Sequence, residues 1–287
     1  MRLHFITSRL SQAALVAAML VSVSILTSCG GKTKDEGRVV TVSIEPLRYF
    51  TEQIAGGRAR VVTMVPKGGN PETYEPSARQ MVALTQSDLY IKVGNIGFEC
   101  TWMQRLQANA PKMVVMSASD GVQSVLTPHG DPDPHVWMSA ANARVMARNI
   151  CGALCRTYVA DSAFFKHNLD SLLQVIDHVD ANVSQRVKAS QAKAFLVYHP
   201  VLTYFAHDYG LRQLVLEEEG REPSAADLQR VVDMAKQAGV KTFFVQREFA
   251  NSNIQVVADE TGSRKVDIHP LGYQWDKEML DVASKLR

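Results

Sequence analysis

The sequence predicts an α/β protein of two lobes, each a roughly four-stranded parallel sheet with flanking helices, joined by one long rigid helix. Short apolar runs alternate with helical patterns, at the spacing typical of parallel sheets with helical crossovers. This alternation occurs twice, and a long amphipathic stretch separates the two series. A chain of 287 residues with 46% hydrophobic content is large enough for two modest lobes.

The N-terminal residues 1–28 are expected to be a signal peptide that is removed. Arg2 and Arg9 precede the apolar stretch AALVAAMLVSVSIL, which is the pattern of a secretory signal and too short for a membrane span. The stretch ends in LTSC, which resembles the lipobox of bacterial lipoproteins. We therefore expect a lipid on Cys29, a tether over 29–38, and an exported protein held at a membrane surface, facing the periplasm or the extracellular side. The alternative is an ordinary signal peptide with a chance cysteine.

The N-terminal lobe is expected over residues 39–160. Its strands are predicted by four apolar runs, which lie at 39–44, 60–65, 89–94 and 112–117. Between the second and third runs, Ser77 precedes a helical pattern and is the expected N-cap of that helix.

The linking helix is expected over 161–190. From Ser162 to Ala189 the apolar residues recur with a period near 3.6, and a helix of this length spans about 42 Å. A packed helix inside one domain is the alternative interpretation. The C-terminal lobe then covers 191–287, and Ser224 is the expected N-cap of one of its helices. Its strands are predicted at 194–199, 211–218, 241–246 and 264–270.

Charge and cysteine content exclude two classes of protein. Without the two signal-peptide arginines the 31 Lys+Arg residues become 29, equal to the 29 Asp+Glu residues, so the mature chain has no net charge. Non-specific nucleic-acid binding is therefore not expected. Three cysteines remain after Cys29, and an odd number excludes a complete disulfide framework. Cys151 and Cys155 have helical spacing and are expected to be small core residues.

Three histidines occupy positions that suit metal ligands. His199 and His269 each end a predicted strand and precede a proline, which holds the backbone extended and so aims the imidazole. His135 lies in the polar loop PHGDPDPH, while Glu72 and Glu75 follow the second strand. The carboxyl ends of parallel strands meet at one edge, so all of these residues can face one cleft. Each histidine alone is a weak signal, because most such residues serve only packing or loop structure.

Five segments together resemble the conserved blocks of the metal-binding solute-binding lipoproteins of bacterial ABC importers, the zinc and manganese group. In chain order they read MVPKGGNPETYEPSARQM, DPHVWMS, FLVYHPVLTYFAHDYGL, EEGREPSAADL and VDIHPLG. The resemblance covers nearly all of 39–287. It implies two α/β lobes, a rigid linking helix, one metal ion in the interlobe cleft and an ABC permease as partner. We expect the protein to act as a monomer.

Two departures from the family pattern look reciprocal. The family's first block usually carries histidine where this chain has Glu72, and its last block usually carries a carboxylate where this chain has His269. The ligand set implied by the resemblance is Glu72, His135, His199 and His269. The alternative is a drifted site in which Glu75, His129 or water completes the ligand shell.

Three imidazoles and one carboxylate favour Zn²⁺ over Mn²⁺, because nitrogen ligands suit zinc and manganese prefers oxygen-rich sites. Manganese or iron in the same role stays open. The expected function is extracytoplasmic capture of Zn²⁺ and its delivery to an ABC-type permease. A closed four-ligand shell leaves no position for a reactive water, so no enzyme activity is expected. The competing classes are a zinc hydrolase with Glu72 or Glu75 as general base, and a lipid-anchored adhesion or interaction protein that needs no metal.

Overall fold

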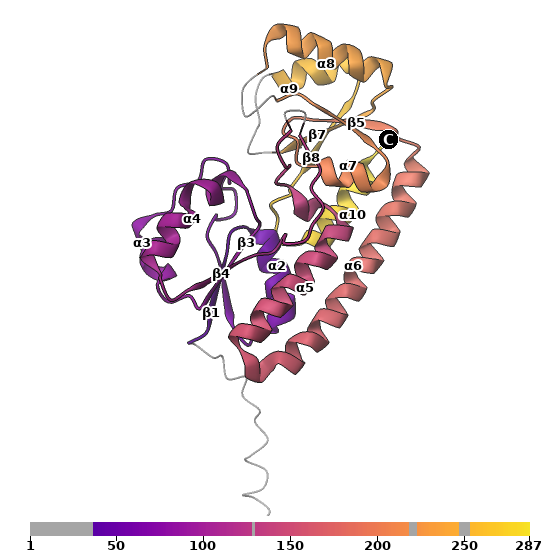
Figure 1. Cartoon of the computed structure of the whole chain (residues 1–287). Coiled ribbons are helices and arrows are strands. Elements are labelled where there is room, and N and C mark those ends of the chain that lie inside the picture. The colour runs from indigo at the N-terminus through magenta and orange to yellow at the C-terminus, as the bar shows by residue number, and fades with distance from the viewer. Residues whose placement is uncertain (1–36, 128–129, 218–222, 247–252) are drawn as a thin grey trace, which may run out of the picture. The chain divides into compact units, whose positions relative to one another are not determined.

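The computed structural model describes residues 37–127, 130–217, 223–246 and 253–287. The predicted fold class is confirmed: two four-stranded parallel sheets with flanking helices are present, and a long helix lies between them in the chain (Figure 1). The expected signal peptide, the lipidation site Cys29 and nearly all of the tether lie outside the described residues. Among the helices that are described, none combines the length and the apolar character needed to cross a bilayer.

The first sheet has the strand order β2-β1-β3-β4, with every neighbouring pair parallel. Its strands are β1 (Val39–Val42), β2 (Arg60–Thr63), β3 (Leu89–Lys92) and β4 (Val114–Ser117). The crossover helices are α2 (Glu45–Ala55), α3 (Ala78–Leu84) and α4 (Gly97–Asn109). Ser77 caps α3 in a reciprocal capping box with Gln80, as the sequence predicts.

The second sheet repeats this topology with the order β6-β5-β7-β8, again parallel throughout. Its strands are β5 (Ala194–Val197), β6 (Arg212–Val215), β7 (Thr242–Gln246) and β8 (Arg264–Ile268). The helices of this half are α7 (Thr203–Tyr209), α8 (Ala225–Gln237), α9 (Asn253–Thr261) and α10 (Trp275–Lys285). Ser224 caps α8 in a second capping box, with Asp227.

Two helices connect the halves. α5 (Ala140–Thr157) is followed after a short 3₁₀ turn by α6 (Ser162–Ser190), and the two pack side by side (Figure 1). The 29-residue α6 also packs against α2 from the first half and α10 from the second. Its buried stripe consists of Phe165, Leu172, Ile176, Val179, Val183 and Val187. The last helix of the chain therefore folds back onto the linking helix, and we retain 39–160, 161–190 and 191–287 as proposed domain bounds.

The hydrophobic core runs through both halves. One cluster includes residues of the first sheet, of α5 and α6, and of one face of the second sheet together with α7 and α10. A second, smaller cluster lies between the opposite face of the second sheet and the pair α8 and α9. The cysteines expected in the core take that role, since Cys151 is buried and Cys155 packs beside it. The shared core ties the loops of the two halves together where the candidate site lies.

Candidate metal centre

Three of the four expected ligands lie together. Glu72 lies in the loop after β2, His135 directly precedes the 3₁₀ turn η1 (Val136–Met138), and His199 lies two residues beyond β5. One possible ligand atom from each of these side chains lies within 4.8 Å of those of the other two. Both sheets thus contribute from the carboxyl ends of their strands, which is where parallel α/β proteins bind ligands.

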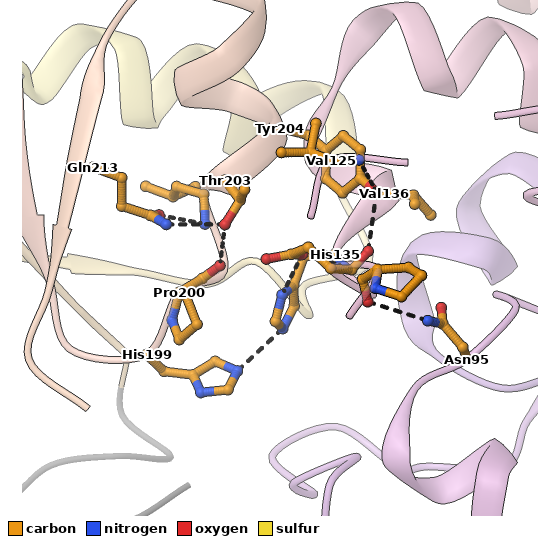
Figure 2. A network of polar contacts seen from close by, with 12 residues as sticks. Asn95, Val125, His135, Val136, His199, Pro200, Thr203, Tyr204 and Gln213 are labelled. Atoms are coloured by element: carbon orange, nitrogen blue, oxygen red, sulfur yellow. Dashed lines mark hydrogen bonds and ion pairs between the residues drawn. The ribbon is translucent and has the colours of Figure 1, made fainter. Parts of the chain in front are cut away.

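The two imidazoles face each other (Figure 2). Their Nε2 atoms are 3.1 Å apart, and their rings meet edge to face with centroids 4.9 Å apart. On the far side of each ring, Nδ1 forms a hydrogen bond with a carboxylate. Asp133 Oδ1 lies 2.9 Å from Nδ1 of His135, and Glu217 Oε2 lies 2.9 Å from Nδ1 of His199. An ionised carboxylate only accepts hydrogen bonds, so each Nδ1 carries its hydrogen and each Nε2 is left for the shared space.

This arrangement suits a divalent cation. With both Nδ1 atoms protonated, the contact between the Nε2 atoms of His135 and His199 requires one hydrogen between them. A metal ion replaces that hydrogen and takes a lone pair from each ring. Two nitrogens bonded to a tetrahedral zinc at about 2.0–2.1 Å lie about 3.3 Å apart, which is close to the observed separation.

The carboxylate behind His135 is built into the protein. Asp133 is 2% exposed and also accepts the backbone N–H of His135 at 2.8 Å. Burial raises the pKa of Asp133, but the hydrogen bonds and charge of His135 outweigh that effect and hold the pKa below its usual range. The Tyr204 hydroxyl donates to the Asp133 carbonyl at 3.0 Å, so α7 of the second half supports the loop. Asp133 is therefore an ionised, fixed partner for the imidazole.

The carboxylate behind His199 comes from the neighbouring strand. Glu217 lies two residues beyond β6 and is buried. Its backbone N–H donates a hydrogen bond to the Tyr198 carbonyl at 3.0 Å, which fixes its position. Asp133 and Glu217 are not among the ligands and partners expected from the sequence. A signal exists for each. Asp133 stands two residues before His135 in DPH, and Glu217 is the next-to-last residue of the strand predicted at 211–218, which follows along the chain the predicted strand that ends at His199. Such second partners orient metal-binding histidines and raise their basicity.

His269 is not part of the group of ligand atoms formed by the described residues. It follows β8 directly, its side chain is exposed, and its backbone N–H donates to Glu278 Oε1 at 2.6 Å. In the strand order β7 lies between β5 and β8, so β8 is two strand spacings, about 10 Å, from β5, the strand that leads to His199. Glu75 is also exposed and outside the group. His129 lies outside the described residues.

The three side chains open into a pocket of about 1120 Å³. Its walls come from both halves and include Asn70, Thr73 and Asp131 near the cluster. The volume is far larger than one ion, so the pocket has room for water beside the ligand atoms.

Residues 40–281 match the family model of the periplasmic zinc-uptake complex component A, ZnuA. The chain belongs to the ZnuA family. A crystal structure of ZnuA superposes with a TM-score of 0.83 at 31% identity, over 87% of this chain and 97% of that one. A zinc-bound ZnuA deletion mutant superposes with a TM-score of 0.82, also at 31% identity and over 87% of this chain and 96% of that one.

Curated relatives give the same assignment. The zinc-binding lipoprotein AdcA of Streptococcus pneumoniae is 24% identical over 90% of this chain, and the aligned part is 55% of AdcA, so the chain spans about half the length of that relative. The high-affinity zinc uptake system protein ZnuA of Bacillus subtilis is 24% identical over 80% of this chain and 77% of its own length. The resemblance found in the five sequence segments is thereby confirmed at the level of the family.

Proposed function

We propose that this protein is the extracytoplasmic zinc-binding component of a zinc importer, which captures Zn²⁺ and delivers it to an ABC-type permease. One observation carries the proposal. Two imidazoles, each held from behind by a carboxylate, direct their Nε2 atoms toward one point that the Glu72 carboxylate also reaches, within 4.8 Å. Membership of the zinc-uptake family over 40–281 supports it.

The ligand chemistry favours zinc. Two nitrogens and one carboxylate oxygen form a nitrogen-rich set, which suits Zn²⁺ better than Mn²⁺. This preference for zinc over manganese is smaller than a set with three imidazoles would give, because His269 is not in the group of ligand atoms. We propose a water molecule as the fourth ligand, which the open pocket admits.

The ligand count alone does not separate transport from hydrolysis. Three protein ligands and a water also describe catalytic zinc sites, so this shell, unlike the closed four-ligand shell expected from the sequence, leaves a position for a reactive water. The relatives favour transport, since those named for zinc are uptake or binding proteins. The hydrolase alternative is therefore not favoured, and we propose zinc as cargo rather than as a resident cofactor.

The remaining parts of the proposal concern location and partners. We propose export through the N-terminal signal, a lipid on Cys29 that holds the mature protein at the membrane, and action as a monomer beside a membrane permease. Support comes from the LTSC motif and from a curated relative that is itself named a lipoprotein.

The test is metal analysis of the mature protein followed by titration calorimetry. We expect one zinc per chain, preference for zinc over manganese in competition, and a higher melting temperature with zinc, since a ligand of the folded state stabilises it. His135→Ala and His199→Ala should each lose most of the affinity. His167→Ala is the matched control, because His167 is an exposed histidine on α6 outside both the ligand group and the pocket. A melting temperature that zinc leaves unchanged would refute the proposal, and turnover of ester substrates would favour the hydrolase.

A further inference from the structure

The loop that carries Glu72 is fastened to the first turn of α4. The Phe98 N–H, in that turn, donates to the Pro71 carbonyl at 2.7 Å, and the rings of Tyr74 and Phe98 pack with centroids 5.8 Å apart. Inside the loop, the Glu72 N–H donates to Asn70 Oδ1 at 2.9 Å. The backbone on both sides of Glu72 is thus held, and α4 sets where this side chain begins.

Gly97, the first residue of α4, borders Glu72 directly. A Cβ atom added at Gly97 would overlap Oε2 of Glu72 and would lie 3.2 Å from both the Cα atom and the carbonyl oxygen of Glu72. Gly97 is not among the glycines with positive φ, so its backbone does not require glycine. Glycine is also a weak helix former compared with alanine. The space taken by Glu72 explains the glycine.

The same helix end is electrostatically suited to a carboxylate. α4 is 13 residues long, and no side chain caps its N-terminus, where Ile96 holds the cap position. The N-terminus of a helix carries partial positive charge from its aligned peptide dipoles, which favours an anion nearby. A carboxylate at position 72 gains from this field, and a neutral imidazole would not.

We infer that Gly97 and the first turn of α4 form a seat that positions Glu72 as a metal ligand, which makes Gly97 a positioning residue that sets zinc affinity. This inference rests on the proposed function. The three atoms nearest to the added Cβ all belong to Glu72, so a substitution at Gly97 acts first on that residue.

The first test is Gly97→Ala in the mature protein, measured by zinc titration calorimetry and by thermal unfolding without metal. We expect zinc affinity to fall by about 10-fold, as for loss of other groups that orient metal ligands. The matched control is Gly152→Ala in α5, another helical glycine, where an added Cβ would meet only Arg156 Nη1 at 3.3 Å. Zinc affinity of the control should equal that of the unmutated protein, and equal affinity in Gly97→Ala would overturn the inference.

A double-mutant cycle separates positioning from general damage. In a Glu72→Ala background, Gly97→Ala should cost no further zinc affinity, whereas an equal further loss would overturn the inference.

A second variant, Glu72→Gln, keeps the shape of the side chain at position 72 and leaves Gly97 in place. It therefore remains a usable test even if Gly97→Ala does not fold. It should bind zinc about 10-fold more weakly, because the neutral amide loses the charge that the helix end and the ion both favour. Unchanged affinity in that variant would also overturn the inference. If the unmutated protein bound no zinc, the proposed function itself would fail, and this inference with it.

Discussion

The indole N–H of Trp275 donates to the backbone carbonyl of Trp137 at 2.6 Å. In return, the indole N–H of Trp137 donates to the carbonyl of Pro270 at 2.8 Å. Both tryptophans are 1% exposed and belong to the core shared by the two halves. The segment after β8 is therefore bound to the turn that follows His135. This pairing holds the His135 loop of the first half against the half that supplies His199.

Replacing Trp275 by phenylalanine should destabilise the protein by about 2 kcal/mol. The change removes the indole donor, leaves the buried Trp137 carbonyl without that partner, and opens a small cavity. Denaturant unfolding measures the loss. Trp102→Phe is the matched control, since Trp102 is only partly buried at α4, and it should change stability much less. A Trp275→Phe protein as stable as the unmutated one would show that the indole hydrogen bond is dispensable.

His269 offers the sharpest test of the ligand set. Its exposed position beyond the third strand of the sheet predicts that His269→Ala changes zinc affinity by less than about 3-fold. His135→Ala removes a nitrogen ligand and should cost at least about 100-fold. Calorimetric titration of both variants side by side is the measurement, and orders of magnitude separate the two expectations. A large loss in His269→Ala would show that the zinc-bound protein brings this histidine to the ion, as the resemblance implied.

Glu217 should matter to zinc although it does not reach the shared ligand point. Glu217→Gln replaces the carboxylate on Nδ1 of His199 with an amide, which weakens the hold on the ring and lowers its basicity. We expect an affinity loss of about 10-fold without a change in the number of bound ions. Glu260→Gln is the control, because Glu260 is an exposed glutamate on α9. Equal affinities in the two variants would remove Glu217 from the site.

Zinc binding should release a proton and weaken in acid. The hydrogen between the two Nε2 atoms competes with the ion, so affinity decreases as the pH falls, because an imidazole must give up its proton to bind a metal. Titration in buffers of different ionisation enthalpy counts the released protons, and about one per zinc is expected. A pH-independent affinity would contradict the shared-proton arrangement.

The cysteines of α4 and α5 should differ in reactivity. Burial, followed in importance by the neighbouring Cys155 thiol, raises the pKa of Cys151 to about 12. At pH 8 its thiolate fraction is then negligible, whereas Cys100 is exposed. Alkylation followed by peptide mass mapping should label Cys100 quickly and Cys151 only after unfolding. Fast labelling of Cys151 in the folded protein would contradict its burial.

The elements of this fold could be predicted because their signals are local. All eight predicted strands occur, trimmed at their ends, and Ser77 and Ser224 cap their helices as expected. Apolar periodicity and capping residues act over one or two turns of chain, so a sequence shows them directly. Because β5 and β8 are shorter than predicted, His199 and His269 lie beyond the ends of their strands. The order of the strands in the sheet then sets the spacing between the two histidine positions.

The sequence by itself determined the α/β class, the long helix, and the candidate ligands Glu72, His135, His199 and His269. Only the tertiary structure decided which candidates meet. Strand order places β7 between β5, which leads to His199, and β8, which leads to His269, and the packing of β6 beside β5 brings Glu217 to His199. The seat of Glu72 on Gly97 depends likewise on α4 packing against a loop more than twenty residues earlier in the chain. Contacts between distant segments depend on how strands order and helices pack, and no local pattern in the sequence records that.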